Sequence, residues 1–262
     1  MTTKRFKKEL VLTKPLVPWM GGKRRLAATL VTMIPEHVCY VEPFAGAGGL
    51  FFNKPESKVE VINDINFDLI NLYRVVKYHF EELIKQFKWV LTSRENWDKT
   101  IATPADTLTD VQRAARFLYL QKLAFGGKTA GQHFGTKTTT RPALNLLTLE
   151  QDLLDMHFRL AQVTIEQLDW SKVISKYDRP HTFFYCDPPY WQVKGYGVEF
   201  GWAHYEQLLK MAQQIKGKMI ISCNDHPDIL ALFSQLESIA VKHRYSAGKK
   251  TTACVEMIFK NF

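Results

Sequence analysis

The sequence TFFYCDPPY, residues Thr182–Tyr190, joins a β-forming run of aromatic residues to two adjacent prolines. Its first five residues predict a buried strand. The strand should end abruptly, because neither proline donates a hydrogen bond to a sheet and each favours an extended residue before it. Asp187 and the Pro188 carbonyl are then expected to face outward beside Tyr190. The stretch therefore places two hydrogen-bond acceptors and an aromatic ring around one small space.

Two fixed acceptors beside a ring suit a flat heteroaromatic ligand that bears an exocyclic amine. The ligand ring would stack on Tyr190, and the amine hydrogens would point at the Asp187 carboxylate and the Pro188 carbonyl oxygen. Such acceptors make the nitrogen more pyramidal and free its lone pair for attack, which is preorganised electrostatic catalysis. The alternative is an ordinary turn at an aspartate and a proline, with no catalytic role.

Two earlier strands with polar turns predict the nucleoside-binding half of an α/β fold. The sequence CYVEPFAGAGG, residues 39–49, indicates a strand that runs into glycines, where the backbone approaches a ligand closely. The second strand, Val59 to Asp64, ends in an acid about 20 residues after the glycine turn, where such folds place a carboxylate on ribose hydroxyls. The alternative for Asp64 is a capping role at the helix that Asn66 is expected to begin.

A further glycine pair precedes these strands. Gly21 and Gly22 predict a turn into a helix whose first residues include Lys23. Helix N-termini favour anionic ligands, and Lys23 is a candidate to neutralise a carboxylate. The alternative is an exposed lysine.

Between residues 80 and 160 the β/α alternation gives way to helical stretches, of which residues 111–124 are the clearest. They surround a Gly- and Thr-rich run, residues 125–141, which has the character of a loop. Residues 125–149 include no acid, so the basic side chains here are a candidate surface for phosphates and base edges. These side chains are Lys128, His133, Lys137 and Arg141. The alternative is a flexible, solvated connection.

The alternation resumes after residue 160, with strands predicted at Val163–Leu168, Lys218–Asn224, Ser238–Tyr245 and Ala253–Phe262. The last two are expected to form an antiparallel hairpin joined by residues 246–252. The sequence therefore predicts an α/β fold with about seven strands and helices between most of them. Residues 1–80 and 161–262 are expected to form the catalytic domain, and residues 81–160 an inserted helical region.

Composition narrows the class of partner. The 262 residues carry a formal net charge of +9, and the sequence pI is about 9.3. This balance favours a polyanionic partner, nucleic acid first. The alternative is a surface that is merely basic and has no such partner.

The mean hydropathy of -0.20 and the short apolar runs predict no membrane span, and the first residues are not followed by a signal-peptide core. We therefore expect a cytoplasmic protein. The four cysteines are far apart and have no paired spacing, which favours free buried thiols over zinc or disulfides. They are Cys39, Cys186, Cys223 and Cys254.

Five of these motifs together resemble the Dam-type DNA adenine methyltransferases, in the order that this family has them. The resemblance spans nearly the whole chain. It implies a class I methyltransferase (Rossmann-like) seven-stranded sheet with a helical target-recognition insertion. The motifs are WMGGK from Trp19, VEPFAGAGG from Val41, NDIN from Asn63, AARFLYL from Ala114 and DPPY from Asp187.

By this resemblance the chain transfers a methyl group from S-adenosylmethionine to the exocyclic N6 amine of a flipped adenine in double-stranded DNA. No metal is implied, and a monomer is favoured. The implied cofactor residues are Trp19, Lys23, Glu42, Phe44, Gly46, Asp64 and Asp187. The implied catalytic residues are Asp187, Pro188, Pro189 and Tyr190. The segment that reads bases in the family corresponds to the 125–141 run, so Lys128, Lys137 and Arg141 are the candidate DNA contacts.

The chain departs from Dam itself at Phe125–Gly135, which lacks the family's asparagine-glycine-leucine stretch and arginine-rich turn. The family's GATC specificity is therefore not implied for this chain, whereas a role in restriction-modification is among the functions that the resemblance implies. Three other functions stay open. They are methylation of an adenine in structured RNA, methylation of a protein amide, and a catalytically degenerate DNA-binding regulator. A dehydrogenase is disfavoured, because the G-x-G-x-x-G pattern is missing.

Overall fold

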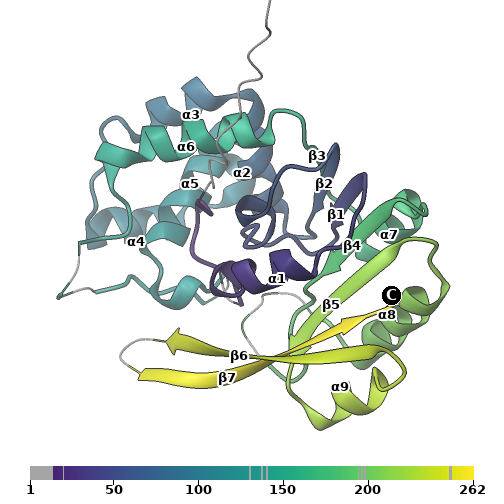
Figure 1. Cartoon of the computed structure of the whole chain (residues 1–262). Coiled ribbons are helices and arrows are strands. Elements are labelled where there is room, and N and C mark those ends of the chain that lie inside the picture. The colour runs from purple at the N-terminus through teal and green to yellow at the C-terminus, as the bar shows by residue number, and fades with distance from the viewer. Residues whose placement is uncertain are drawn as a thin grey trace, which may run out of the picture.

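The computed structural model describes residues 14–19, 21–129, 131–136, 138–139, 141–193, 195, 197, 199–247 and 250–262. Its centre is a seven-stranded sheet in the order β3-β2-β1-β4-β5-β7-β6, which confirms the predicted strand number (Figure 1). The strands are β1 (Cys39–Glu42), β2 (Val59–Asn63), β3 (Thr164–Glu166), β4 (Thr182–Cys186), β5 (Lys218–Asn224), β6 (Glu237–Ala247) and β7 (Lys250–Lys260).

The first five strands run parallel, and β7 is antiparallel to both β5 and β6. The register aligns Val41 of β1 with Val61 of β2 and with Phe184 of β4. The carboxyl ends of these central strands therefore meet at one edge of the sheet. In open α/β sheets ligands bind in the crevice outside this edge.

Helices cover both faces of the sheet, and each face has its own hydrophobic core. Alternation along β4 sends Phe183 and Tyr185 into one core and Phe184 and Cys186 into the other. On the second face lie α7 (Trp170–Tyr177), α8 (Trp202–Gln214) and α9 (Pro227–Leu232). On the first face lie η1 (Lys23–Arg25), α1 (Ala27–Met33), η2 (Phe51–Asn53) and α2 (Phe67–Tyr78).

The expected helical region lies between α2 and β3. Its elements are α3 (Phe80–Phe87), α4 (Arg94–Ala102), η3 (Ala105–Thr107), α5 (Asp110–Leu123), η4 (Phe125–Gly127) and α6 (Leu146–Leu160). These helices gather at one end of the sheet in Figure 1. Buried residues of α5 and α6 belong to the same core as α2, so the region packs directly on the sheet-bearing part of the chain. The division at residues 81 and 160 stays a prediction.

Local signals explain where several helices begin. Asn66 accepts a hydrogen bond from the backbone N–H of Leu69 at 3.0 Å, as a helix N-cap does. Thr109 and Gln112 form a reciprocal capping box at the start of α5. The α5 helix therefore begins one residue before the predicted Val111.

The terminal hairpin is longer than the sequence predicts. The loop expected at residues 246–252 is wrong, because β6 continues to Ala247 and pairs there with Lys250 of β7. By contrast β3 has only three residues, where six were predicted. Strand ends depend on which neighbour a strand pairs with, and this information is not local to the strand.

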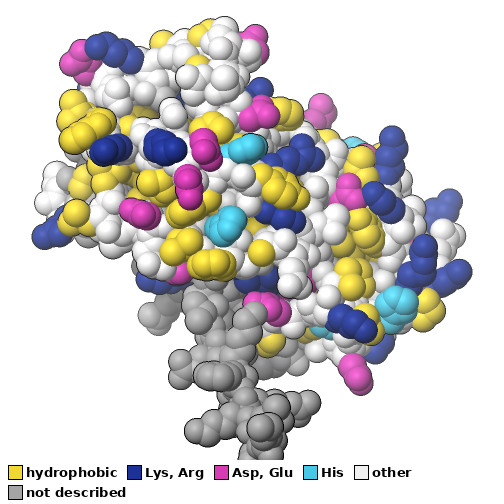
Figure 2. Space-filling view, turned by 90° about the horizontal axis from the view of Figure 1, so that it is seen from above, with side chains coloured by type: hydrophobic (Ala, Val, Ile, Leu, Met, Phe, Trp, Pro, Cys, Tyr) yellow, Lys and Arg dark blue, Asp and Glu magenta, His cyan; other side chains and the backbone are white. Residues whose placement is uncertain are grey.

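Figure 2 shows Lys and Arg side chains interspersed with Asp and Glu over the helical part of the molecule, and several Lys and Arg side chains near one another on the right of the view. No helix in the described part of the chain has the length and apolar character needed to cross a membrane.

Candidate active site

A cavity of about 310 Å³ lies at the carboxyl ends of the central strands. Its wall is built from the turns that follow β1, β2, β3 and β4, together with the segment before α1. The lining includes nearly all the predicted site residues: Trp19, Lys23, Glu42, Phe44, Gly46, Asp64, Asp187, Pro188 and Pro189. The structure thus brings together predicted residues from four separate stretches of sequence.

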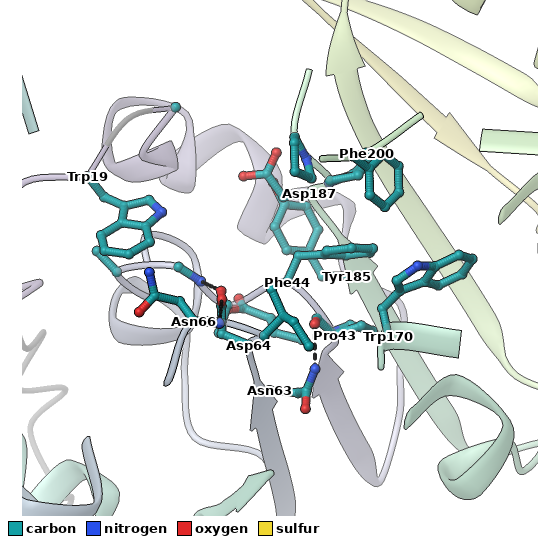
Figure 3. A pocket seen from close by; sticks show the side chains of 18 of the residues that line it. Trp19, Pro43, Phe44, Asn63, Asp64, Asn66, Trp170, Tyr185, Asp187 and Phe200 are labelled. Carbon is teal, nitrogen blue, oxygen red and sulfur yellow. Dashed lines mark hydrogen bonds between the residues drawn. The ribbon is translucent and has the colours of Figure 1, made fainter. Parts of the chain in front are cut away.

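One end of the cavity, which we call the Asp64 end, is built from the turns after β1 and β2. Asp64 Oδ2 accepts the backbone N–H of Gly46 at 2.8 Å, and Oδ1 accepts that of Asn66 at 2.8 Å (Figure 3). Burial raises the pKa of Asp64, and these backbone hydrogen bonds oppose the rise. The carboxylate is fixed, and each oxygen keeps a second lone pair for a ligand hydroxyl.

The glycine turn lets an indole ring close over the Asp64 end. Gly46 has φ +48°, and a Cβ there would lie 2.7 Å from Trp19 Nε1. Any side chain at Gly46 would therefore push Trp19 away. Tyr73 donates its hydroxyl hydrogen to the Gly46 carbonyl oxygen at 2.7 Å and holds the turn from below.

The opposite end, which we call the Lys23 end, is a buried network of charged groups. Lys23 Nζ lies 2.6 Å from Asp187 Oδ1 and 2.7 Å from the hydroxyl oxygen of Tyr190. The Tyr190 hydroxyl donates to Glu256 at 2.5 Å, and Lys23 Nζ lies 3.5 Å from the same carboxylate. Lys23 is only 4 % exposed, so the alternative of a solvated lysine is excluded.

The electrostatics of the Lys23 end follow from one cation between two carboxylates. Burial works to lower the pKa of Lys23, but Asp187 and Glu256 raise it above its ordinary value. Burial raises the pKa of Asp187 to about 7, with Lys23 opposing and Glu256 adding to the rise. Asp187 is therefore a carboxylate poised to change protonation near neutral pH, a feature typical of functional sites.

A third acid, Glu42, lies at the end of β1. It is 2 % exposed, and it accepts a hydrogen bond from the hydroxyl of Tyr40 two residues earlier on the same face of the strand. Burial raises its pKa to about 8, and the Tyr40 bond opposes the rise. Glu42 therefore lines the cavity as a carboxyl group whose ionisation is unfavourable, because the group is buried.

Aromatic side chains close one flank of the cavity. Phe44 stacks on Trp170 with ring centroids 5.7 Å apart, and Phe200 stacks on His204 at 4.7 Å. Figure 3 shows Trp170 and Phe200 on the side of the cavity away from Trp19. The buried Tyr185 hydroxyl also borders the cavity and has no hydrogen-bond partner among the described residues. An apolar flank and an unsatisfied donor suit a ligand with both a ring and polar groups.

The turn after β4 is fixed by hydrogen bonds to side chains of β5 and α8. Asn224, the last residue of β5, accepts the backbone N–H of Trp191 at 3.1 Å and donates to its carbonyl oxygen at 3.2 Å. The Tyr205 hydroxyl donates to the Pro189 carbonyl oxygen. These bonds fix residues 189–191 relative to β5 and α8.

Two of the predicted DNA contacts, Lys128 and Arg141, are not part of the lining of this cavity. Lys128 and Arg141 are exposed, and Lys137 lies outside the described residues. A second cavity of about 560 Å³ adjoins the first through Trp19 and Gly22, and it separates η1 from the 123–143 segment. Its charged lining is basic only: Arg24, Arg25 and Lys122.

Sequence reasoning missed several residues of the site. Glu256 lies in a strand where only its polarity amid apolar neighbours marks it, and Asp169 and Trp170 follow a strand that the motifs did not flag. Asp169 caps α7 through the backbone N–H of Ser171 at 2.9 Å and lines the cavity. An acid directly after a predicted strand was the available signal for Asp169.

The strand order and the antiparallel β7 agree with the Rossmann-like sheet of a class I methyltransferase, and the acid-lined cavity lies at the carboxyl edge of this sheet. A profile of the family described as D12 class N6 adenine-specific DNA methyltransferase matches residues 19–247, and the chain belongs to this family. It is accordingly an S-adenosylmethionine-dependent enzyme that methylates adenine N6 in DNA.

The chain is similar to two DNA-methyltransferase relatives over most of its length, and to one solved structure only distantly. The chain is 30% identical over 224 residues to a DNA adenine methylase of Haemophilus influenzae, covering 80% of this chain and 77% of that protein. It is 26% identical over 204 residues to the type II methyltransferase M.MjaIII of Methanocaldococcus jannaschii, covering 68% of this chain and 69% of the relative. A solved rRNA methylase from Streptococcus thermophilus has 10% identity and a TM-score of 0.37, covering 91% of this chain and 96% of that one.

Proposed function

We propose that the enzyme methylates adenine at a specific site in duplex DNA, after the base has turned out of the helix into the Lys23 end of the cavity. The observation that carries this proposal is the fixed turn after β4, where Asp187 meets the buried Lys23 at 2.6 Å. Adenine N6 is inaccessible to an enzyme cavity while the base is stacked, so extrusion is required, at a cost of a few kcal/mol.

The cavity fits S-adenosylmethionine in size and in chemistry. Its volume lies at the lower end of ordinary ligand pockets, about 300 to 1,000 Å³. Asp64 supplies a charged acceptor for the ribose hydroxyls, and Phe44 and Trp170 offer an apolar flank for the adenine ring of the cofactor. The glycine turn at Gly46 and the indole of Trp19 would enclose it. Glu42 and Lys23 complete the polar lining.

S-adenosylmethionine supplies an electrophilic methyl group when it is bound. Asp187 and the Pro188 carbonyl accept the two amine hydrogens of the target adenine and raise the nucleophilicity of its nitrogen. Lys23 contacts Oδ1 of Asp187, so Oδ2 is the oxygen that this contact leaves open, and it is proposed as the acceptor for the amine. Pro189 and Tyr190 complete the adenine pocket. The carboxylate must be ionised to serve as this acceptor.

The DNA path is proposed to cross from the first cavity to the 123–143 segment. This segment packs on the catalytic part, because a Cβ at Gly127 would lie 3.1 Å from the backbone of Pro18 and Trp19. Gln121 of α5 donates to the Pro18 carbonyl oxygen at 2.8 Å. The basic second cavity therefore sits where a strand leaving the adenine pocket would meet the insertion.

Within this path, Arg141 is proposed as a base reader and Lys128 and Lys137 as phosphate contacts, since arginine offers a bidentate fork and lysine a point charge. Residues 81–160 would act as the target-recognition region, and residues 1–80 and 161–262 as the catalytic domain.

We propose a monomer in the cytoplasm. No group of His, Cys, Asp or Glu in the described residues could hold a metal ion.

The substrate is tested by offering radiolabelled S-adenosylmethionine with duplex DNA and with a structured RNA of matching sequence. Label is expected in the DNA, at adenine N6, and sequencing of modified bases then gives the recognition site. Label in the RNA alone would overturn the proposal. Tight cofactor binding without transfer to either polymer would favour the alternative of a degenerate DNA-binding regulator.

A further inference from the structure

Glu256 is a buried carboxylate in the middle of β7, far in sequence from every motif of the site. It is 2 % exposed, and it pairs in register with Asn224 of β5 and Val241 of β6. Alternation along β7 places Met257 in the core of α7, α8 and α9 and Ile258 in the opposite core. Glu256 therefore faces the same side of the sheet as Ile258, toward Lys23 and Tyr190.

The partners of Glu256 belong to the proposed reaction centre. Tyr190 donates its hydroxyl hydrogen to the Glu256 carboxylate, with 2.5 Å to Oε1 and 2.6 Å to Oε2. Ser222 of β5 donates to Oε1. Lys23 Nζ lies 3.5 Å from the same oxygen. The carboxylate thus joins β5, the turn after β4 and η1 at one point.

Burying a carboxylate is costly unless it is paired and hydrogen-bonded. An apolar residue at position 256 would satisfy β7 as well as Ile258 does, so the sheet does not require an acid there. What the acid adds is orientation. Without it, the hydrogen bonds that Ser222 and the Tyr190 hydroxyl donate to this carboxylate would be lost, together with its ion pair to Lys23 at 3.5 Å.

We propose that Glu256 is a positioning residue of the methyl transfer: it holds the Tyr190 ring and the Lys23 ammonium in place beside Asp187. This inference rests on the proposed function of the same site. Glu256 itself is one group removed from the adenine amine, and it acts through Tyr190 and Lys23. A ring anchored by its hydroxyl keeps one orientation when the base enters, and this reduces the loss of freedom on binding.

The Glu256 charge also bears on the ionisation of Asp187. Glu256 adds to the raised pKa of Asp187, and Lys23 opposes it. Removal of the Glu256 charge should therefore lower the pKa of Asp187 and keep it ionised at lower pH. The other titratable or polar groups around the network are Glu42 at the end of β1, Tyr185 of β4, and Ser222 and Cys223 of β5.

The test compares Glu256→Gln with a matched control, Glu237→Gln. Glu237 is an exposed glutamate of β6 that pairs with Lys260 in the same sheet, away from the site. The Glu256→Gln variant should lose at least about tenfold in kcat on duplex DNA, since a small misplacement of reacting groups is costly. Its affinity for S-adenosylmethionine by calorimetry should stay within about threefold. Glu237→Gln should match the wild type in kcat and in affinity for S-adenosylmethionine.

Two readouts separate positioning from mere stability. The acid limb of the kcat/KM profile should move to lower pH by about half a unit or more in Glu256→Gln. In a double-mutant cycle, Tyr190→Phe should cost less activity in the Glu256→Gln background than in the wild type, because glutamine replaces the charged acceptor by a weaker neutral one and phenylalanine removes the donor of the same hydrogen bond. A folded Glu256→Gln variant with wild-type turnover overturns the inference. The inference is also overturned if the loss of kcat in Glu256→Gln is additive with the loss in Tyr190→Phe and the acid limb of the kcat/KM profile does not move.

If Glu256→Gln fails to fold, Tyr190→Phe alone decides, because it keeps the ring and removes the hydroxyl that bonds Glu256 and Lys23. Wild-type turnover in Tyr190→Phe then overturns the inference, and a tenfold loss supports it. The proposed function fails separately: in that case the wild-type enzyme itself transfers no methyl group to duplex DNA.

Discussion

The Asp64 end and the Lys23 end of the cavity both present a carboxylate to the same space, but they hold it differently. Asp64 is fixed by backbone N–H groups of Gly46 and Asn66, from the turn after β1 and from its own turn. Asp187 is fixed by the side chain of Lys23, 164 residues away, which in turn meets Glu256 at 3.5 Å.

The kind of donor that holds each carboxylate indicates the role to which that carboxylate is suited. Backbone donors belong to the sheet and its turns and do not titrate, so they suit a group that binds hydroxyls at any pH near neutrality. A buried cation shared between two acids makes the ionisation of Asp187 sensitive to its neighbours. We therefore expect changes at the Lys23 end to affect turnover and its pH dependence, and changes at the Asp64 end to affect affinity.

The largest effect is expected at Asp187. Asp187→Ala should lower kcat by at least about 10²-fold, because a fixed acceptor for the amine is lost from the transition state. Single-turnover methylation of duplex DNA measures this directly. The control is a melting curve, which should show a folded protein. Near-normal methylation by a folded Asp187→Ala variant would remove Asp187 from the mechanism.

The pH dependence of the wild-type enzyme provides a second measurement at this end. Asp187 has a pKa of about 7 and must be ionised to accept the amine, so kcat/KM should fall as the pH drops below about 7. The fall should approach tenfold per pH unit for a single group. A profile that stays flat down to pH 5 would contradict the assignment.

Glu42 tests whether a buried charge at the cavity costs stability. Its pKa is raised to about 8, so the folded state binds this proton more tightly than the unfolded chain does. The penalty is therefore absent below the unfolded pKa of about 4.5, grows as the pH rises, and is complete above about 8. Glu42→Gln should then stabilise the fold at pH 9 by about 2 to 4 kcal/mol and by much less at pH 5.

Denaturant unfolding at the two pH values measures the Glu42 effect. The matched control is Glu36→Gln, at an exposed glutamate just before β1, which should leave stability unchanged at both. An equal change in the free energy of unfolding at pH 5 and pH 9 would contradict the stated cause. Cofactor affinity should fall in Glu42→Gln, because the residue lines the cavity.

At the Asp64 end, Asp64→Ala should weaken S-adenosylmethionine by about 1 to 3 kcal/mol, since the ribose hydroxyls lose a charged acceptor. Turnover at saturating cofactor should change far less than in Asp187→Ala, which is the sharpest form of the comparison between the two ends. Calorimetry measures the affinity. Unchanged binding would mean that Asp64 only organises the Gly46 turn.

The smallest effects are expected outside both ends, on the DNA side. Arg141→Ala should cost about 1 to 3 kcal/mol on the preferred site only, as a base contact does. Lys128→Ala should weaken all DNA alike and reduce the salt slope by about 0.9, as one lost phosphate contact does. Methylation of the preferred site and of single-base variants at two salt concentrations separates them. If neither the site preference nor the salt slope changes in these variants, the residues that recognise the DNA sequence lie elsewhere.

Much of the fold was predictable because its signals are local. The apolar runs predict the seven strands, and Asn66 and Thr109 cap helices as their sequence context indicates. The length of the terminal hairpin was not predictable, because the pairing of Ala247 with Lys250 depends on cross-strand register. The identity of the family rested on the order of five motifs, and the matching family profile confirms it.

The sequence by itself determined the strands, the glycine turn at Gly46 and the acid that follows β2, since the interactions that hold them span few residues or belong to adjacent parallel strands. The burial of Lys23, its bridge between Asp187 and Glu256, and the hydrogen bond from Tyr190 to Glu256 are seen only in the tertiary structure. The physical reason is that a buried charge is tolerated only where distant segments bring its partners together. No local pattern records those partners.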